Sequence, residues 1–381
     1  MRTLLLTGPG GAGTSTLAAA AAVRAARSGR RTLLLSRQAP AVAALDAEPG
    51  LTLRTVDPQG AVEGLWAGAA DPVAAVLPHL TLPPASSVVP LPGAADLALF
   101  AELARADADL VVVDAGPIGS AVALVSLPAT LRWWLDQLMP PGMRALGAVR
   151  TAAVASGAVR RGPVDAALSA VPAVEGLLAS DRLGDPASVG VHLVAPPRAA
   201  SAPALRAAAT ALGLHGFRAG ALLSRVLPLP GDDEWTTRRA AEQEAALTEL
   251  AEVAPVGPVP ELAVAPDGPD GVAALLDEPL PGTTGFTTPG PERHEGAWRL
   301  TVSLPFAEHG AVTLTRWVDD LVLTVGGVRR SLRLDPLLRR CEVTGGRLAD
   351  PGTADARLEV GFRPDPQLWP ADLLSAEGRT S

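Results

Sequence analysis

The stretch TLLLTGPGGAGTST, Thr3–Thr16, decides the fold of this chain. It opens with a continuous apolar run, which is typical of a strand buried in a parallel sheet. Four glycines follow, and residues 16–28 are alanine-rich and predict a helix. A glycine-rich turn between a strand and a helix directs backbone N–H groups at an anion. The stretch therefore predicts a phosphate-binding loop, and a plain strand-to-helix turn is the alternative.

The buried-strand pattern recurs along the first 276 residues, with helical segments between the runs. The further runs are Arg31–Ser36, Asp109–Asp114, Gly190–Ala195 and Gly220–Ser224. Apolar strands that alternate with helices predict an α/β fold, in which helices cover both faces of a parallel sheet. We therefore interpret residues 1–276 as one α/β domain.

The sequence changes character after residue 276. Residues 277–295 are rich in proline, glycine and threonine and are typical of a linker. Short alternating strands then follow, which predict a small antiparallel β-sandwich over 296–364. Residues 365–381 are interpreted as a loose tail.

Composition narrows the class of function. The chain has 381 residues, a net charge of −8 and a single cysteine, Cys341. A negative balance argues against a nucleic-acid surface, which needs clustered cations. One cysteine excludes disulfides within the chain and favours a reducing cytoplasm. No run reaches the roughly 18–20 uninterrupted apolar residues of a membrane span, so we expect none.

The glycine loop resembles that of the ArsA family, which comprises arsenite-pump ATPases and cytosolic ATPases that deliver tail-anchored membrane proteins. The family's loop is G-K-G-G-V-G-K-[TS]-T, and the matching residues here are Gly8, Gly10, Gly11, Gly13, Ser15 and Thr16. The resemblance implies a P-loop NTPase fold that binds ATP or ADP with magnesium. Pro9 and Thr14 stand where the family has its two lysines. The whole chain has no lysine, which strong GC pressure explains for surface positions but not for a catalytic cation.

The loss of these lysines weighs more on hydrolysis than on binding. One charge-assisted hydrogen bond contributes about 1.5–3 kcal/mol, so its loss weakens binding roughly tenfold to a hundredfold. A cation on the transferring phosphoryl group is worth on the order of 10³–10⁵ in rate. Only an arginine could replace the charge, and Arg37 is the nearest candidate in the sequence.

A second segment, DLVVVDAGPIGSAVALVSLP at 109–128, resembles the family's magnesium-linked switch. Asp114, Pro117 and Gly119 keep their places, and the resemblance implies that Asp114 and Ser15 hold magnesium. The switch's threonines and histidine are replaced by apolar residues and a serine. In the alternative reading, Asp114 only caps the next turn.

Two further segments keep the family's pattern but not its chemistry. Residues 36–40, SRQAP, stand where the family has S-T-D-P-A, so Gln38 replaces the aspartate that prepares the attacking water. Residues 212–228 resemble the segment that ends in N-R-V-L-P. There Ser224 replaces an asparagine that contacts adenine, and Arg225 is retained.

Residues 298–362 resemble the α-crystallin (small heat-shock) domain that some ArsA relatives carry. The hairpin Leu321–Leu334, with Gly326 and Gly327 at its turn, is the most specific part. Such sandwiches bind other chains through edge strands and apolar grooves. The alternative is that this domain packs on the first and stabilises it.

An apolar segment follows the switch and contains Trp133, Trp134, Met139 and Met143. In the tail-anchor-targeting relatives, the corresponding region lines a groove for a hydrophobic client. We consider such a client surface here, with ordinary helix core or a dimer interface as the alternative. The family's paired cysteines are absent, so a dimer, with itself or with an ArsA-like paralogue, would not be bridged through zinc.

Three hypotheses follow from the sequence. In the first, the chain is a pseudo-ATPase that binds nucleotide weakly or not at all and holds a protein or hydrophobic client. In the second, it hydrolyses ATP and couples hydrolysis to client delivery or ion transport. In the third, the α-crystallin-like domain acts as a holdase. An arsenite-pump role is disfavoured, because Cys341 lies outside the ATPase-like domain.

Overall fold

The computed structural model describes residues 2–76, 81–158, 163–281, 290–294 and 297–369. Its first unit is built on a seven-stranded sheet of order β3-β2-β4-β1-β5-β6-β7, in which every neighbouring pair is parallel. The strands are β1 (Arg2–Gly8), β2 (Thr32–Ser36), β3 (Leu51–Thr55), β4 (Leu110–Pro117), β5 (Val189–Ala195), β6 (Ala219–Val226) and β7 (Val256–Pro260). The predicted α/β fold is confirmed.

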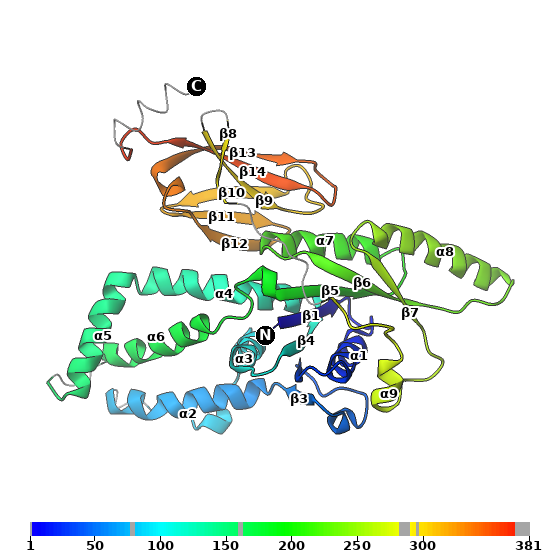
Figure 1. Cartoon of the computed structure of the whole chain (residues 1–381). Helices are drawn as coiled ribbons and strands as arrows, with labels where there is room; N and C mark the ends of the chain where they lie inside the picture. Colours follow the sequence, from blue (N-terminus) through cyan, green and yellow to red (C-terminus); the bar gives the residue numbers. More distant parts are fainter. Residues whose placement is uncertain (1, 77–80, 159–162, 282–289, 295–296, 370–381) are drawn as a thin grey trace.

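Helices cover both faces of this sheet (Figure 1). They are α1 (Thr14–Arg27), α2 (Pro58–Val76), α3 (Ala94–Arg105), α4 (Ile118–Leu138), α5 (Pro141–Ala155), α6 (Pro163–Ala179), α7 (Ser201–Leu214), α8 (Glu234–Ala251) and α9 (Gly268–Ala273). Short 3-10 turns lie at Leu45–Ala47, Ala85–Ser87, Pro186–Ser188 and Leu338–Arg340. Alternate side chains of a strand point to opposite faces, so Leu5 of β1 packs with α3, α4, α7 and α8, while Leu4 and Leu6 pack with α1 and α9.

The second unit is an antiparallel sandwich of two sheets, β10-β11-β12 and β13-β14-β9-β8. Its strands are β8 (Glu292–His294), β9 (Ala297–Ser303), β10 (Val312–Trp317), β11 (Asp320–Val325), β12 (Val328–Arg333), β13 (Cys341–Ala349) and β14 (Arg357–Pro364). The hairpin β11–β12 turns at Gly326 and Gly327, whose φ angles are both positive, as a tight hairpin requires. β8 lies inside the segment that we interpreted as a linker, and most of the predicted tail, 370–381, lies outside the described residues.

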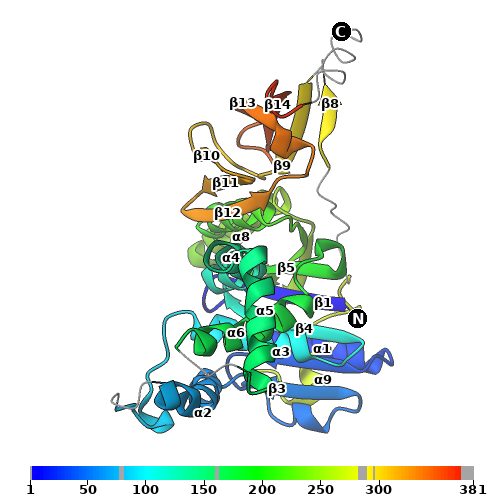
Figure 2. The same ribbon diagram turned by 90° about the vertical axis from the view of Figure 1, so that its left-hand side faces the viewer.

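The sandwich contacts α4 and α7, and Figure 2 shows β12 lying above α4. Leu214 at the end of α7 is buried in the core of the sandwich. The Thr210 hydroxyl donates to the carbonyl of Pro305 at 2.5 Å, and Arg330 Nη1 donates to the carbonyl of Leu214 at 2.5 Å. Buried hydrogen bonds of this kind fix the junction, because leaving such groups without partners costs about 1–3 kcal/mol each.

Candidate functional site

The loop between β1 and α1 has the backbone shape of an anion-binding turn. Gly11 and Gly13 have φ angles of 78° and 93°, in the left-handed region that favours glycine. Gly13 is the N-cap of α1, and no side chain caps that end of the helix. In the part of the chain that the structure describes, the amides of Thr14, Ser15 and Thr16 donate no hydrogen bond. These amides, at the positive end of the helix dipole, are available to an anion.

Neither of the positions that correspond to the family's lysines supplies a cation. Thr14 is only 9% exposed, and its Oγ1 lies 3.3 Å from the point where a Cβ on Gly8 would lie. Pro9 is half-buried, and its carbonyl accepts the N–H of Ala12 at 3.2 Å. Ser15, by contrast, is exposed. The loop therefore keeps an accessible hydroxyl while it lacks the positive charge.

An arginine from β6 reaches the loop instead. Arg225 Nη2 donates to the carbonyl of Gly11 at 3.2 Å, and its Cδ lies 3.3 Å from the point where a Cβ on Gly13 would lie. Its Nη1 lies 3.3 Å from Oε2 of Glu261, and its side chain is 34% exposed. Arg37, the substitute that the sequence offered, is directed to Asp96 at 2.5 Å and not to the loop.

The end of β4 lies directly beside the loop. Asp114 is level with Leu6 of β1, and Pro117 is level with Gly8. Asp114 is 8% exposed, and its Oδ1 accepts the N–H of Gly116 at 3.1 Å, so this oxygen caps the turn as the alternative reading expected. Its Oδ2 accepts no hydrogen bond within the described residues. Gly119, in the first turn of α4, is exposed with open space around it.

Ser224 is placed differently from the loop residues. It is fully buried, level with Ala195 of β5 and Pro258 of β7, and its hydroxyl has no partner within the described residues. The Ser224 hydroxyl is therefore not accessible to a ligand in this structure. The resemblance to an adenine contact therefore extends to its position on the strand and not to its exposure.

A cavity of about 260 Å³ adjoins the loop, and no motif in the sequence pointed to most of its wall. Gly13, Thr16 and Arg225 form one side, and the segment 261–266 after β7 forms the other. Leu262 and Val264 in that segment are 42% and 77% exposed. The cavity thus combines an anion-binding loop, exposed apolar side chains and a cation, Arg225, which pairs with Glu261 in the same lining. Apolar surface with a few placed polar groups is the composition of a ligand site. In the described residues no group of three or more His, Cys, Asp or Glu is arranged to hold a metal, so magnesium would depend on Ser15, Asp114 and a phosphate.

Of the predicted client residues, Trp133 and Trp134 lie on α4, Met139 is its C-cap residue, and Met143 lies on α5. The rings of Trp133 and Trp134 meet edge to face with centroids 4.9 Å apart. Trp134 and Met143 are 51% and 55% exposed, while Met139 is half-buried. Exposed large apolar side chains continue the surface at Leu138, Leu146 and Val149. We call this group of apolar side chains on and between the two helices the α4–α5 patch, because exposed large apolar side chains in such number mark a candidate interaction site.

α4 is also long and apolar enough to cross a membrane by length and composition alone, and it is the one helix of the described chain that passes this test. Core helices pass the same test. The first half of α4 is packed in the fold, with Leu124 and Val125 buried on the sheet. Pro128, Arg132 and Asp136 interrupt the apolar sequence.

Known proteins match this sequence over nearly the whole chain. The family model described as anion-transporting ATPase matches residues 1–275, and that of the HSP20-like domain found in ArsA matches residues 295–362. The uncharacterized protein SCO2128 of Streptomyces coelicolor is 37% identical over 97% of this chain and 99% of its own length. Protein Rv2184c of Mycobacterium tuberculosis is 32% identical over 97% of each chain.

A more distant relative has an activity in its name. The arsenical pump-driving ATPase of Escherichia coli is 28% identical over 38% of this chain and 28% of its own length. The resemblance that the loop and the switch suggested is thus confirmed. By its matched models, its parallel sheet and its attached sandwich, the chain belongs to the ArsA ATPase family and carries the HSP20-like domain found in that family.

Proposed function

We propose that this protein is a pseudo-ATPase, which binds a nucleotide weakly in the β1–α1 loop, hydrolyses it negligibly and holds an apolar client. This proposal rests on a contrast within the loop. The amides of Thr14, Ser15 and Thr16 donate no hydrogen bond within the described residues, yet the side chains of Thr14 and Pro9 supply no charge. Backbone donors suffice to bind phosphate. Rapid phosphoryl transfer needs cations that neutralise the transition state.

Magnesium would be held by the Ser15 hydroxyl and, beyond it, by Asp114, with the phosphate oxygens completing the shell. Calorimetric titration with Mg-ATP and Mg-ADP tests the nucleotide site. We expect binding that weakens roughly tenfold in Ser15→Ala, because one metal ligand is lost. Without magnesium, the variant and the native protein should bind ADP equally, which separates metal ligation from a loss of fold. Equal affinities with magnesium, or no heat at millimolar nucleotide, would contradict the proposal.

The α4–α5 patch supports the client part of the proposal. Trp134, Leu138, Met143, Leu146 and Val149 are each more than half exposed, and methionine suits a surface that adapts to different apolar partners. The same surface would also serve pairing with a second copy or with an ArsA-like paralogue.

A second candidate, a working ATPase, rests on Arg225. Its guanidinium lies at the loop within 3.2 Å of the Gly11 carbonyl, where it could neutralise a bound phosphate. If it does so, Arg225→Ala should lower the rate of phosphate release by at least tenfold, since one charge-assisted contact is worth about 1.5–3 kcal/mol. Arg238→Ala is the matched control, because this arginine is 80% exposed on α8 and pairs only with Glu234 among the described residues. Turnover that is equally low in the native protein and in both variants would favour the pseudo-ATPase.

A further inference from the structure

A second cavity, of about 500 Å³, lies where α4 meets the sandwich. One face of α4 forms its first wall, because Ala129, Trp133 and Gln137 recur at the helical spacing of four. The sheet β10-β11-β12 forms another wall, and His215, the C-cap residue of α7, also lines the cavity. The cavity is therefore built by one helix, three strands and the end of a second helix, and these segments are far apart in the sequence.

Its lining is apolar and positively charged. Trp133, Trp134, Trp317 and Val322 supply the apolar surface. Arg329 and Arg330 supply two cations, and the lining contains no Asp or Glu. In a chain of net charge −8, a cavity with only positive charges is selective for anions.

Arg330 is the more informative of the two. It makes no ion pair within the described residues, and its hydrogen bond is to the neutral carbonyl of Leu214. Burial lowers its pKa to about 10. An arginine that is partly buried without a carboxylate is an unbalanced charge that an anionic ligand would neutralise.

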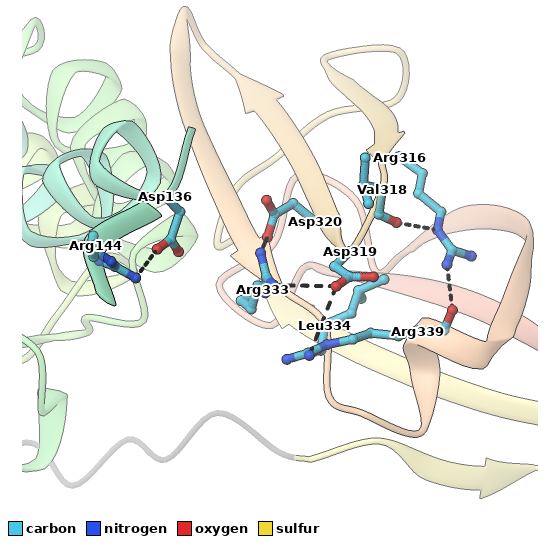
Figure 3. Close-up of polar contacts among 9 residues, drawn as sticks. All are labelled: Asp136, Arg144, Arg316, Val318, Asp319, Asp320, Arg333, Leu334 and Arg339. Atoms are coloured by element: carbon cyan, nitrogen blue, oxygen red, sulfur yellow. Dashed lines mark hydrogen bonds and ion pairs between the residues drawn. The ribbon is translucent and has the colours of Figure 1, made fainter. Parts of the chain in front are cut away.

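The acids near this junction are already paired with other arginines (Figure 3). Asp136 of α4 accepts from Arg144 at 3.0 Å. On the sandwich, Arg333 lies 3.3 Å from Asp319 and 3.7 Å from Asp320. The fold thus neutralises one side of the junction and leaves the cations of the cavity without partners among the described acids.

Three side chains of the lining also carry a buried polar atom with no hydrogen-bond partner in the described residues: Trp133 Nε1, His215 Nε2 and Ser331 Oγ. His215 is only 5% exposed. Burial, with Arg330 beside it, lowers its pKa to about 4, so the ring is neutral near pH 7. Unbonded buried groups are uncommon in native proteins, and their gathering around one cavity points to a missing polar ligand.

We propose that this cavity binds a small amphipathic carboxylate, whose acid group meets Arg330 and whose apolar body lies against the tryptophans. The size supports a small molecule, since ligand sites span about 300–1,000 Å³. A client helix of 20 residues, about 30 Å long and about 10 Å wide, would need several times this space. The cavity shares Trp133 and Trp134 with the α4–α5 patch, but its size fits a small molecule and its ligand does not depend on nucleotide binding.

Calorimetric titration of the full chain with decanoate tests the proposal, and decyltrimethylammonium is the matched cationic probe, each below its micelle concentration. We expect one decanoate per chain and at least tenfold weaker binding of the cation. Arg330→Gln should weaken decanoate binding roughly tenfold to a hundredfold, because a charge-assisted contact is lost. Arg347→Gln, an exposed arginine on β13 outside the cavity, should leave it unchanged.

A second variant, which fills the cavity, tests the proposal without changing Arg330, whose substitution could also disturb the fold. Ala129→Phe places a ring in the cavity from the α4 side and should abolish decanoate binding. Equal binding of the two probes, no binding of decanoate, or an affinity that stays within twofold in Ala129→Phe would overturn the proposal. Titration of the same variants with Mg-ADP should match the native protein, so a failure at this cavity is distinguishable from a failure at the loop.

Discussion

Gly8→Ala is expected to lower the free energy of unfolding by about 3 kcal/mol, at the upper end of the range for overpacking a core. A Cβ on Gly8 would lie 1.9 Å from the carbonyl oxygen of Val194. That atom belongs to the backbone of β5, which pairs with β1 up to Thr7 and Leu193. The clash can therefore be removed only if two central strands of the sheet move apart, because the clashing atom is not in a side chain that can rotate away.

Urea denaturation of the native protein and two variants measures this effect. Gly10→Ala is the matched control, because Gly10 lies in the same loop, has no atom within 4 Å of its added Cβ and does not have a positive φ. We expect it to change the free energy of unfolding by no more than about 0.5 kcal/mol. Equal unfolding midpoints for the two alanine variants would show that β1 and β5 tolerate a wider spacing.

The centre of the sheet could be predicted from the sequence, but its edges could not. β1, β2, β4, β5 and β6 are continuous apolar runs because both faces of each are covered. β3 has one fully buried residue, Leu51, and β7 contains Pro258 and Pro260. An edge strand bonds on one side only, so it tolerates polar residues and proline and loses the signal of a buried strand.

The same limit applies to the candidate site. The position of the loop follows from a local pattern, since the glycines, the strand and the helix are adjacent in the sequence. The identity of the cation at the loop does not follow from a local pattern, because Arg225 is 214 positions from Gly11 in the sequence. Arg37, which is nearer in the sequence, pairs with Asp96 instead. Likewise Trp133 and Trp134 stood out as apolar residues, but only the fold brings Arg330 and His215 to the same cavity.

Thr14→Lys is expected to strengthen Mg-ATP binding roughly tenfold to a hundredfold, because it returns a charge-assisted contact to the phosphates. The backbone that would present this lysine is already in place, with Gly11 and Gly13 in the left-handed conformation. Thr14→Gln, which is polar but uncharged, is the control. It should bind Mg-ATP with an affinity close to that of the native protein, so the difference between the two variants isolates the charge.

Turnover in Thr14→Lys should rise far less than affinity, by no more than about tenfold, because the other parts of phosphoryl transfer are still missing. Gln38 stands where the family has the aspartate that prepares the water, and Pro9 stands where it has its other lysine. Calorimetry and phosphate release on the same samples separate binding from hydrolysis. A folded Thr14→Lys protein with unchanged affinity would mean that the loop does not hold phosphate at all, and the nucleotide part of the proposed function would fall. A strong gain in both quantities would mean instead that a single substitution separates this chain from a working ATPase.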